Sequence, residues 1–299
     1  MSTFTRLNQV YKVSENIEFD DTSRLIFFSD CHRGDNSWAD NFARNRSLFR
    51  HTLEHYYREG YTYIEIGDGD ELWENRSFSD IFNAHRDTFL LMQKFHHEGR
   101  FYMLWGNHDI IKKNRRFVEK NLCKCKNRYF SKGEPLFDGI HPHEGLVLTH
   151  KETSGKIFVV HGHQGDLIND RYWPLARFLV RYFWRPLELL GFRNPSSPAV
   201  NNIKTLSIER KLIDWLQVNN CALMAGHTHQ PRFPTGREPR YLNTGCCVRP
   251  GYITGIEISR GEVSLVKWRI NPSAGSTLKV EKEILSGPLK LRDLFAGLS

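Results

Sequence analysis

The chain has 299 residues, with 42 Lys and Arg against 34 Asp and Glu, which gives a formal net charge of +8. This length allows one large domain or two small ones, and a hydrophobic share of 39% excludes an intrinsically disordered chain. The positive charge favours anionic partners such as phosphate esters, nucleotides, nucleic acid or anionic lipid. We see no signal peptide and no apolar stretch that could span a bilayer, so we expect a cytoplasmic protein with reduced cysteines.

The first hundred residues alternate short apolar runs with helical patterns. Apolar runs over 25–28, 61–66 and 101–105 predict buried strands, and periodic apolar positions over 38–59 and 79–98 predict the helices between them. This rhythm predicts an α/β sheet whose strands are joined by right-handed helical crossovers. In such a sheet, the loops beyond the carboxyl ends of the strands gather at one edge and form the site.

The second half of the chain has a less regular pattern. A second, mainly antiparallel or mixed sheet is expected from short strands near 145–149, 156–160, 221–225, 240–243, 251–258 and 262–269. Helical signals over 169–217 interrupt these strands and predict an inserted cap near the site. We therefore expect one domain over 1–283 and a C-terminal tail over 284–299 that carries a short helix.

Five short motifs rich in metal ligands occur along the chain, most of them directly after a predicted strand. In chain order they are Asp30-Cys31-His32, Gly67-Asp68, Gly106-Asn107-His108-Asp109, His161-Gly162-His163 and Gly226-His227-Thr228-His229. A dinuclear hydrolase needs two cations about 3.5–4 Å apart that share a bridging carboxylate. Imidazole nitrogens fill the outer positions, and an Asn oxygen adds a ligand without charge. The motifs supply this set with seven side chains: Asp30, His32, Asp68, Asn107, His161, His227 and His229.

The spacing within two of the motifs also suits a shared metal cluster. One residue separates Asp30 from His32, and one residue separates His227 from His229. On an extended backbone such residues point to the same side, so both members of a pair can approach one cluster. The mixed set of His, Asp and Asn accepts Mn, Fe or Zn, and metal availability often decides among them.

These motifs resemble those of the calcineurin-like metallophosphoesterases, a superfamily marked by D-x-H, G-D, G-N-H-[DE], a later His and G-H-x-H. The resemblance covers residues 25 to about 247 and implies a four-layer α-β-β-α sandwich of two mixed sheets. It also implies two divalent metal ions bridged by Asp68. One ion would be held by Asp30, His32 and His229, and the other by Asn107, His161 and His227.

The resemblance implies that His108 faces the substrate rather than a metal. The His of G-N-H-D donates a hydrogen bond to the phosphoryl group or protonates the leaving oxygen, and an imidazole suits this role near neutral pH. Asp109 and Glu71 are both candidates to orient it, and we name His108 and Asp109 as the catalytic residues.

Two further residues beside the ligands are candidates for substrate binding. His163 is expected either to contact phosphate in the pocket or to support the metal ligands. Arg33 is expected either to reach a phosphate or to form a surface salt bridge.

The segment 171–186, between the fourth and fifth motifs, combines arginines with aromatic residues. Arg177, Arg181 and Arg185 are spaced four residues apart and would form one basic stripe on a helix. Two interpretations stay open: a cap that binds an anionic or amphipathic substrate through Arg177 and Arg181, and a helix that only covers a sheet edge. The cap interpretation includes a peripheral membrane contact through the same arginines and aromatic side chains.

We therefore predict a dinuclear metal-dependent phosphoesterase that hydrolyses a phosphate ester or pyrophosphate of a small anionic or amphipathic molecule. The insert is similar to the helical lid of UDP-diacylglucosamine pyrophosphatases, which act on a lipid-linked diphosphate at a membrane surface. Those enzymes have Arg where this chain has His108.

Three other functions have to be compared with this prediction. A nuclease or cyclic-nucleotide phosphodiesterase is one alternative, and the net charge of +8 would then favour a nucleic acid partner. A Ser/Thr protein phosphatase fits less well, because Leu72 stands where the G-D-x-x-D-R-G motif of that branch has Arg. The complete ligand set argues against a non-catalytic scaffold.

Overall fold

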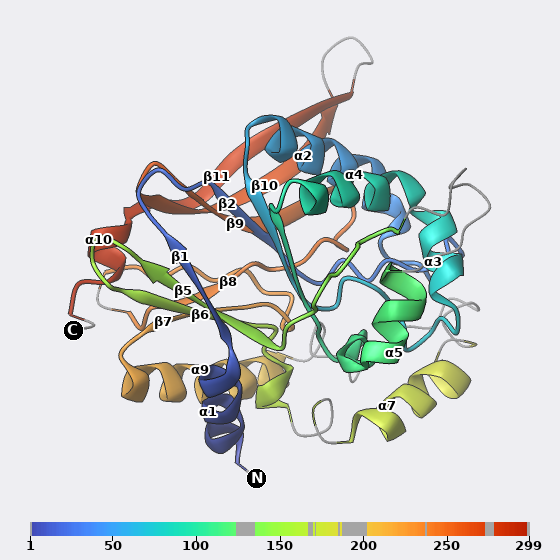
Figure 1. The fold of residues 1–299 in the computed structure, drawn as a ribbon, viewed down its shortest axis with the longest axis horizontal. Helices are drawn as coiled ribbons and strands as arrows, with labels where there is room; N and C mark the ends of the chain where they lie inside the picture. The colour runs from blue at the N-terminus through green and yellow to red at the C-terminus, as the bar shows by residue number, and fades with distance from the viewer. Residues whose placement is uncertain are drawn as a thin grey trace.

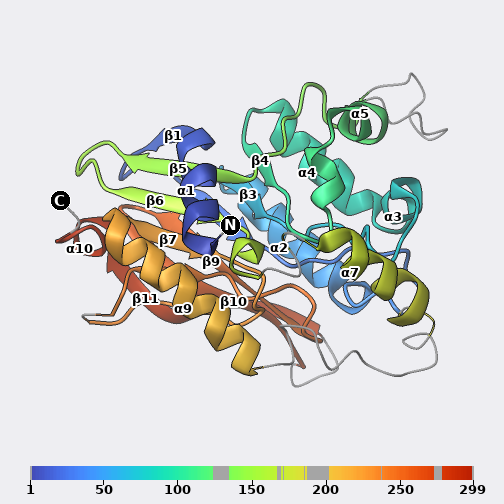
Figure 2. The ribbon, with the colours of Figure 1, turned by 90° about the horizontal axis from the view of Figure 1, so that it is seen from below.

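The structure is a computed structural model that describes residues 2–123, 135–166, 170, 172–184, 186, 202–236, 238–272 and 278–297. Its strands form two sheets that pack face to face, and helices cover both outer faces (Figure 1 and Figure 2). None of the described helices has the length and apolar character that crossing a membrane requires.

The larger sheet contains the first three strands predicted from the sequence. Its order is β11-β10-β9-β2-β3-β4; β3 is parallel to β2 and to β4, and the other pairs are antiparallel. The strands are Leu25–Phe28 (β2), Thr62–Ile66 (β3), Phe101–Leu104 (β4), Tyr252–Ser259 (β9), Glu262–Pro272 (β10) and Leu278–Lys290 (β11). The strands expected over 251–258 and 262–269 therefore form, but they extend the first sheet, because β9 pairs with β2.

The smaller sheet has the order β1-β5-β6-β7-β8, and only the β5-β6 pair is antiparallel. Its strands are Glu15–Phe19 (β1), Gly145–His150 (β5), Lys156–Val160 (β6), Ala222–Ala225 (β7) and Tyr241–Asn243 (β8). Both sheets are thus mixed, as predicted.

Three buried apolar clusters hold the layers together. The first lies between the larger sheet and its helices, with Phe49 and Phe95 against Tyr63. The second fills the space between the sheets, and the third joins the smaller sheet to its helices. The covering helices are α1 (Thr3–Val13) and α9 (Asn202–Asn219) on the smaller sheet, and α2 (Arg46–Arg58), α3 (Phe78–Ala84) and α4 (Arg86–His97) on the larger one. This arrangement confirms the predicted α-β-β-α sandwich.

Two segments differ from the predicted domain organisation. Helix α9 was assigned to the cap, but it buries Leu212 and Trp215 against the smaller sheet and belongs to the core. The expected tail over 284–299 begins within β11, which hydrogen-bonds to β10, and continues into α10 (Leu291–Leu294), where Leu291 and Leu294 are buried. The described part of this segment therefore completes the larger sheet.

The cap that remains is a helix of two parts, α7 (Trp173–Leu179) and the π-helical turn η5 (Val180–Trp184). It contains no buried residue. It lies at the same end of the molecule as α3 and α5 (Arg115–Val118), away from α10 (Figure 1 and Figure 2). Arg185 and residues 187–201 lie outside the described residues.

Candidate metal centre

The predicted ligands lie just beyond the carboxyl ends of strands, where the backbone turns sharply. Five of them have left-handed backbone angles, with φ of +52° at Asp30, +47° at His32, +48° at Asp68, +66° at His227 and +57° at His229. The left-handed conformation costs about 1–2 kcal/mol for a residue with a side chain. The expectation that the D-x-H and H-x-H pairs converge on an extended backbone is therefore wrong. Tight left-handed turns bring these side chains together, and such strain clusters at functional sites.

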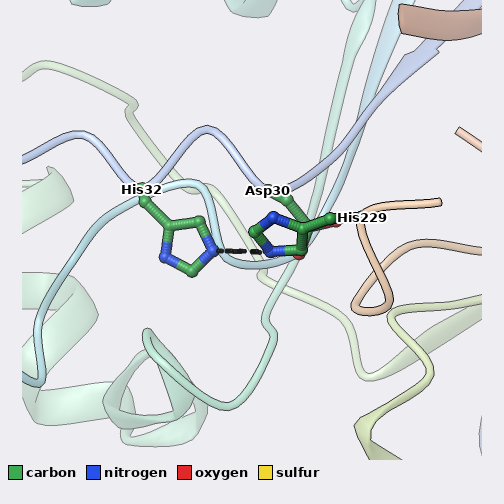
Figure 3. Close-up of side chains that lie close together, drawn as sticks. All are labelled: Asp30, His32 and His229. Carbon is green, nitrogen blue, oxygen red and sulfur yellow. Dashed lines mark hydrogen bonds and ion pairs between the residues drawn. The ribbon is translucent and has the colours of Figure 1, made fainter. Parts of the chain in front are cut away.

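The first ligand group consists of Asp30, His32 and His229 (Figure 3). The Nε2 atoms of His32 and His229 are 3.3 Å apart, and Asp30 Oδ1 lies 3.2 Å from His229 Nε2. The other carboxylate oxygen, Asp30 Oδ2, accepts hydrogen bonds from the Ser29 hydroxyl and from the His227 backbone N–H. Asp30 is thus held by one oxygen while the other faces the two imidazoles.

Asp68 has the same arrangement and faces both ligand groups. Its Oδ1 accepts a hydrogen bond of 2.8 Å from the His108 backbone N–H. Its Oδ2 lies 3.8 Å from His32 Nε2 in the first group and 3.1 Å from His161 Nε2 in the second. The second group consists of Asp68, His161 and His227. One oxygen of Asp68 is therefore the atom common to both groups.

Hydrogen bonds also fix which nitrogen of each imidazole faces the centre. His161 Nδ1 donates to the Ile66 carbonyl over 2.8 Å, and His32 Nδ1 lies 2.9 Å from Glu71 Oε2. Both rings are therefore left with Nε2 toward the carboxylates, which is the usual way that neighbouring groups orient metal-ligating histidines.

Several of these atoms are buried and have no hydrogen-bond partner among the described residues. They are Asp30 Oδ1, Asn107 Oδ1, His161 Nε2 and His227 Nε2. Buried polar atoms are nearly always paired in folded proteins, so four unpaired ones in a single cluster require a ligand. Carboxylate and amide oxygens with imidazole nitrogens suit divalent metal ions, so these side chains could hold such ions.

The charges within the cluster point the same way. Burial opposes the ionisation of Asp30, but the facing His229 and His32 outweigh it and hold the pKa of this carboxyl well below its usual range. Burial likewise opposes protonation of His161 and His229, yet Asp68 and Asp30 raise the pKa of each imidazole to about 9. The negative charge of both carboxylates is therefore directed at the imidazole nitrogens that would ligate a metal cation.

His108 lies beside the first ligand group and is held by Glu71 and Trp73. Its Nδ1 is 2.8 Å from Glu71 Oε1, and its ring stacks on Trp73 with centroids 4.3 Å apart and planes 23° apart. Burial opposes ionisation of Glu71, but His108 and His32 lower the pKa of this carboxyl to about 2. The His108 side chain keeps 22% of its surface exposed, so substrate can reach it. Of the two candidates to orient His108, Glu71 is the one in contact.

The Asp109 carboxylate binds backbone N–H groups and does not contact the His108 ring. It accepts from the backbone N–H groups of Gly106, Asp68, Gly69 and Asp70, and it pairs with Lys112 Nζ over 2.7 Å. These bonds hold the G-D and G-N-H-D loops against each other. The assignment of Asp109 as a catalytic residue is therefore not supported by its position.

Arg33 also lies behind the ligands and not in the pocket. It is fully buried and pairs with Glu65 over 2.7 Å and with Asp70 over 2.8 Å. Because its guanidinium is enclosed by these two carboxylates, Arg33 does not reach a substrate phosphate. Its salt bridges are buried, whereas a surface salt bridge was the alternative expected.

His163 is fully buried next to the second ligand group, with its ring centroid 5.6 Å from that of His161. Burial keeps the pKa of His163 well below the usual range, and the neighbouring His161 and His227 lower it further. This burial fits the supporting role better than contact with a substrate.

The two cap arginines differ in their contacts. Arg177 lies over the Trp173 ring at 5.3 Å from its centroid and is partly exposed. Arg181 donates to backbone carbonyls of the loop over 72–75, so its guanidinium is turned toward the protein body. The structure therefore leaves Arg177 near solvent and engages Arg181 within the molecule.

Three neighbours of the ligands escaped the sequence analysis. Asp166 Oδ2 lies 3.8 Å from His227 Nε2 and 2.7 Å from Lys204 Nζ. Burial opposes ionisation of the Cys246 thiol, but the neighbouring His229 lowers its pKa, and Trp73 stacks on His108. Gly165-Asp166 repeats the G-D pattern and was a usable signal, whereas nothing in the sequence marks Cys246 or Trp73.

The sandwich and the paired ligand groups together define a metal-dependent hydrolase. The model of the calcineurin-like phosphoesterase family matches residues 23–231, and the chain belongs to this family of phosphoester hydrolases. Its members generally use two divalent metals. The resemblance read from the motifs is thereby confirmed.

Solved structures similar to the chain include two that match most of its length. One is a point mutant of a cold-active protein tyrosine phosphatase, with 12% identity over 92% of this chain and 84% of that chain and a TM-score of 0.40. The other is Vps29 from Chaetomium thermophilum, with 10% identity over 88% of this chain and 96% of that chain and a TM-score of 0.35. A search among curated proteins gave no match.

Proposed function

We propose that the protein is a dinuclear phosphoesterase in which the seven predicted ligands hold two divalent ions, with Mn, Fe and Zn as the first candidates. The observation that carries this proposal is Asp68 Oδ2, a single carboxylate oxygen that faces both ligand groups. A bridging carboxylate between two ions is the defining element of such centres. A cytoplasmic location stays a prediction.

When bound, the ions would lower the pKa of a water ligand and polarise the phosphoryl oxygens. The chain's own contribution to the reaction is His108. Glu71 accepts a hydrogen bond from Nδ1–H, so a protonated ring keeps its Nε2 proton for the leaving oxygen. Stacking on Trp73 fixes the plane of the ring, and the buried ligands behind it limit access to the exposed edge.

The test is metal analysis coupled to an activity screen. Asp68→Asn and His229→Ala should each lower the bound metal below two equivalents and reduce turnover by about a thousandfold or more, because the metal-dependent acceleration is lost. His141→Ala, an exposed histidine outside the ligand groups, is the matched control and should change neither quantity. Unchanged metal content and turnover in Asp68→Asn would overturn the site assignment.

The exposed cap favours an amphipathic substrate within this class. Leu175, Phe178 and Phe183 keep 58–59% of their surface exposed, and Tyr172, Leu179 and Tyr182 are also exposed. Large exposed apolar patches mark binding sites or membrane contacts. Arg177 on the same helix supplies positive charge for a phosphate or an anionic headgroup. A lipid-linked or nucleotide-linked diphosphate, as in the UDP-diacylglucosamine pyrophosphatases, is therefore the finer proposal.

A substrate screen separates this proposal from its rivals. A diphosphate with a long apolar group should be hydrolysed with a lower KM than the same diphosphate without it. Preference for a cyclic nucleotide or for nucleic acid would instead support the phosphodiesterase or nuclease alternatives, and equal KM values would remove the cap from substrate recognition.

A further inference from the structure

The cap meets the body of the protein through polar contacts. Arg181 Nε donates to the Trp73 carbonyl over 2.8 Å, and Arg181 Nη2 donates to the Leu72 and Asn75 carbonyls over 2.8 and 3.1 Å. Because α7 and η5 bury no side chain, these bonds contribute directly to where the cap sits. Charged donors to carbonyls form stronger hydrogen bonds than neutral ones.

The same loop, residues 71–75, is held from its other side by Glu71. The Glu71 carboxylate accepts from the backbone N–H groups of Trp73 and Glu74, over 3.2 and 3.3 Å. The Asn75 side chain donates to the Glu71 carbonyl over 2.9 Å. Glu71 therefore accepts from two N–H groups of this turn, while Arg181 donates to three of its carbonyls, so both side chains help to hold the turn.

This turn also carries the two groups that hold His108. Glu71 contacts the Nδ1 atom of His108, and Trp73 covers the face of the ring. A shift of the turn would move both contacts together. The chain of contacts thus runs from the cap through Arg181 and the turn over 71–75 to the imidazole of His108.

We propose that Arg181 is a positioning residue that sets the orientation of His108 through this turn. The sequence predicted contact between Arg181 and substrate, whereas the hydrogen bonds assign it to the loop carbonyls. The inference rests on the proposed function, because it requires His108 to protonate the leaving oxygen. It also couples substrate recognition to catalysis, since the helix that offers the apolar surface is the helix that holds the acid in place.

The experiment compares Arg181→Met with wild type on aryl phosphates that range from p-nitrophenyl, a good leaving group, to phenyl, a poor one. A mispositioned acid matters most for the poor leaving group. We expect kcat for phenyl phosphate to fall by about tenfold to a hundredfold, with a much smaller fall for the p-nitrophenyl ester and two metal equivalents retained. Arg181→Lys keeps the charge but cannot donate to all three carbonyls in the same way. Its kcat for phenyl phosphate should lie between those of wild type and Arg181→Met.

Two further variants make the test specific. In a His108→Ala background, Arg181→Met should cause no additional loss, because the group that it positions is absent. Arg177→Met is the matched control on the same helix; it should affect KM for an amphipathic substrate and leave the dependence on the leaving group unchanged.

The outcomes separate this inference from the proposed function. An equal fall in kcat across the aryl series, or an additive loss in the His108→Ala background, would show that Arg181 only supports the fold. If His108→Ala itself leaves the dependence on the leaving group unchanged, the acid role of His108 is wrong and this inference falls with it. If kcat depends more steeply on the leaving group in His108→Ala but not in Arg181→Met, this inference is wrong and the proposed function stands.

Discussion

The ligand groups and the cap are held in opposite ways. Each carboxylate of the ligand groups has one oxygen bonded to a backbone N–H and one turned to the centre, as Asp30 and Asp68 show. The cap buries none of its side chains and meets the body through Arg181 and through cation–π contacts such as that of Lys113 with the Trp173 ring.

The difference matches what each region needs: the ligand groups need a fixed geometry, and the cap needs an exposed surface. Metal ligands need their geometry set before the ion binds, since a loosely held ligand loses affinity. A surface for an amphipathic molecule needs exposed apolar area, which a fully packed helix would not offer. Within the part of the chain that the structure describes, the proposed chemistry lies where buried hydrogen bonds hold the ligands, and the proposed recognition surface lies outside that region.

The largest expected effect tests how the ligand loops are held from behind. Lys112 is fully buried and pairs over 2.7 Å with both Asp70 and Asp109. Lys112→Met would leave two buried carboxylates without this cation, and removal of one partner from a buried ion pair costs about 3–5 kcal/mol. Urea unfolding should show this loss of free energy, and metal affinity should fall because Asp109 braces the ligand loops.

The control for this variant is Arg115→Met. Arg115 pairs with Glu119 over 3.0 Å, but its side chain is 91% exposed, and such pairs contribute about 0–1 kcal/mol. Equal free energies of unfolding for the two variants would show that the buried charges do not hold the ligand loops.

Much of the centre could be predicted from the sequence because its ligands are local signals. Asp30, Asp68 and Asn107 each follow a short apolar strand, so their place at one sheet edge follows from chain order. The sequence could not show whether Glu71 or Asp109 orients His108. Asp109 is next to His108 in the chain, whereas Glu71 reaches it only because of how the turn over 71–75 is folded. The buried partners of Arg33 could not be predicted either. Glu65 lies within a strand, and the sequence does not show that its side chain is buried against Arg33.

The fold likewise contains elements that the sequence predicts and elements that it does not. The parallel strands β2 to β4 were predictable from their apolar runs, whereas β11 was not, because most of its described side chains are exposed and show no apolar alternation. Helix α9 could have been separated from the cap by its apolar residues at Ile208, Leu212 and Trp215, which lie on one face at helical spacing.

A smaller effect is expected from pH on the protein stripped of metal. In this state His161 and His229 have pKa values raised from 6.5 to about 9 by Asp68 and Asp30, against the effect of burial. A raised pKa in the folded state contributes stability below pH 6.5, and this contribution is lost as the pH rises through about 9. The free energy of unfolding of the chelated protein should therefore fall across this window.

Metal-loaded protein is the comparison for this measurement, because ligation requires both rings to be deprotonated throughout. Its stability should not show the same decline between these pH values. The double variant His161→Gln and His229→Gln, also free of metal, should show a flatter profile than the chelated wild type. A chelated wild type whose stability is constant or rises with pH would contradict the ion pairs described for these two rings.

The smallest effect on stability, and the clearest test of the cap, is expected from Phe178→Ser combined with Phe183→Ser. Both side chains are 58% exposed and their helix buries nothing, so the free energy of unfolding should change by only about 0.5 kcal/mol. Turnover of a small aryl phosphate should be unchanged, while KM for a diphosphate with a long apolar group should rise, because that group loses its contact surface. Phe49→Ser, at a buried position of α2, is the contrasting variant and should lower the free energy of unfolding much more. If the cap variant loses as much stability as Phe49→Ser, the cap is part of the packed fold and the contrast with the metal centre fails.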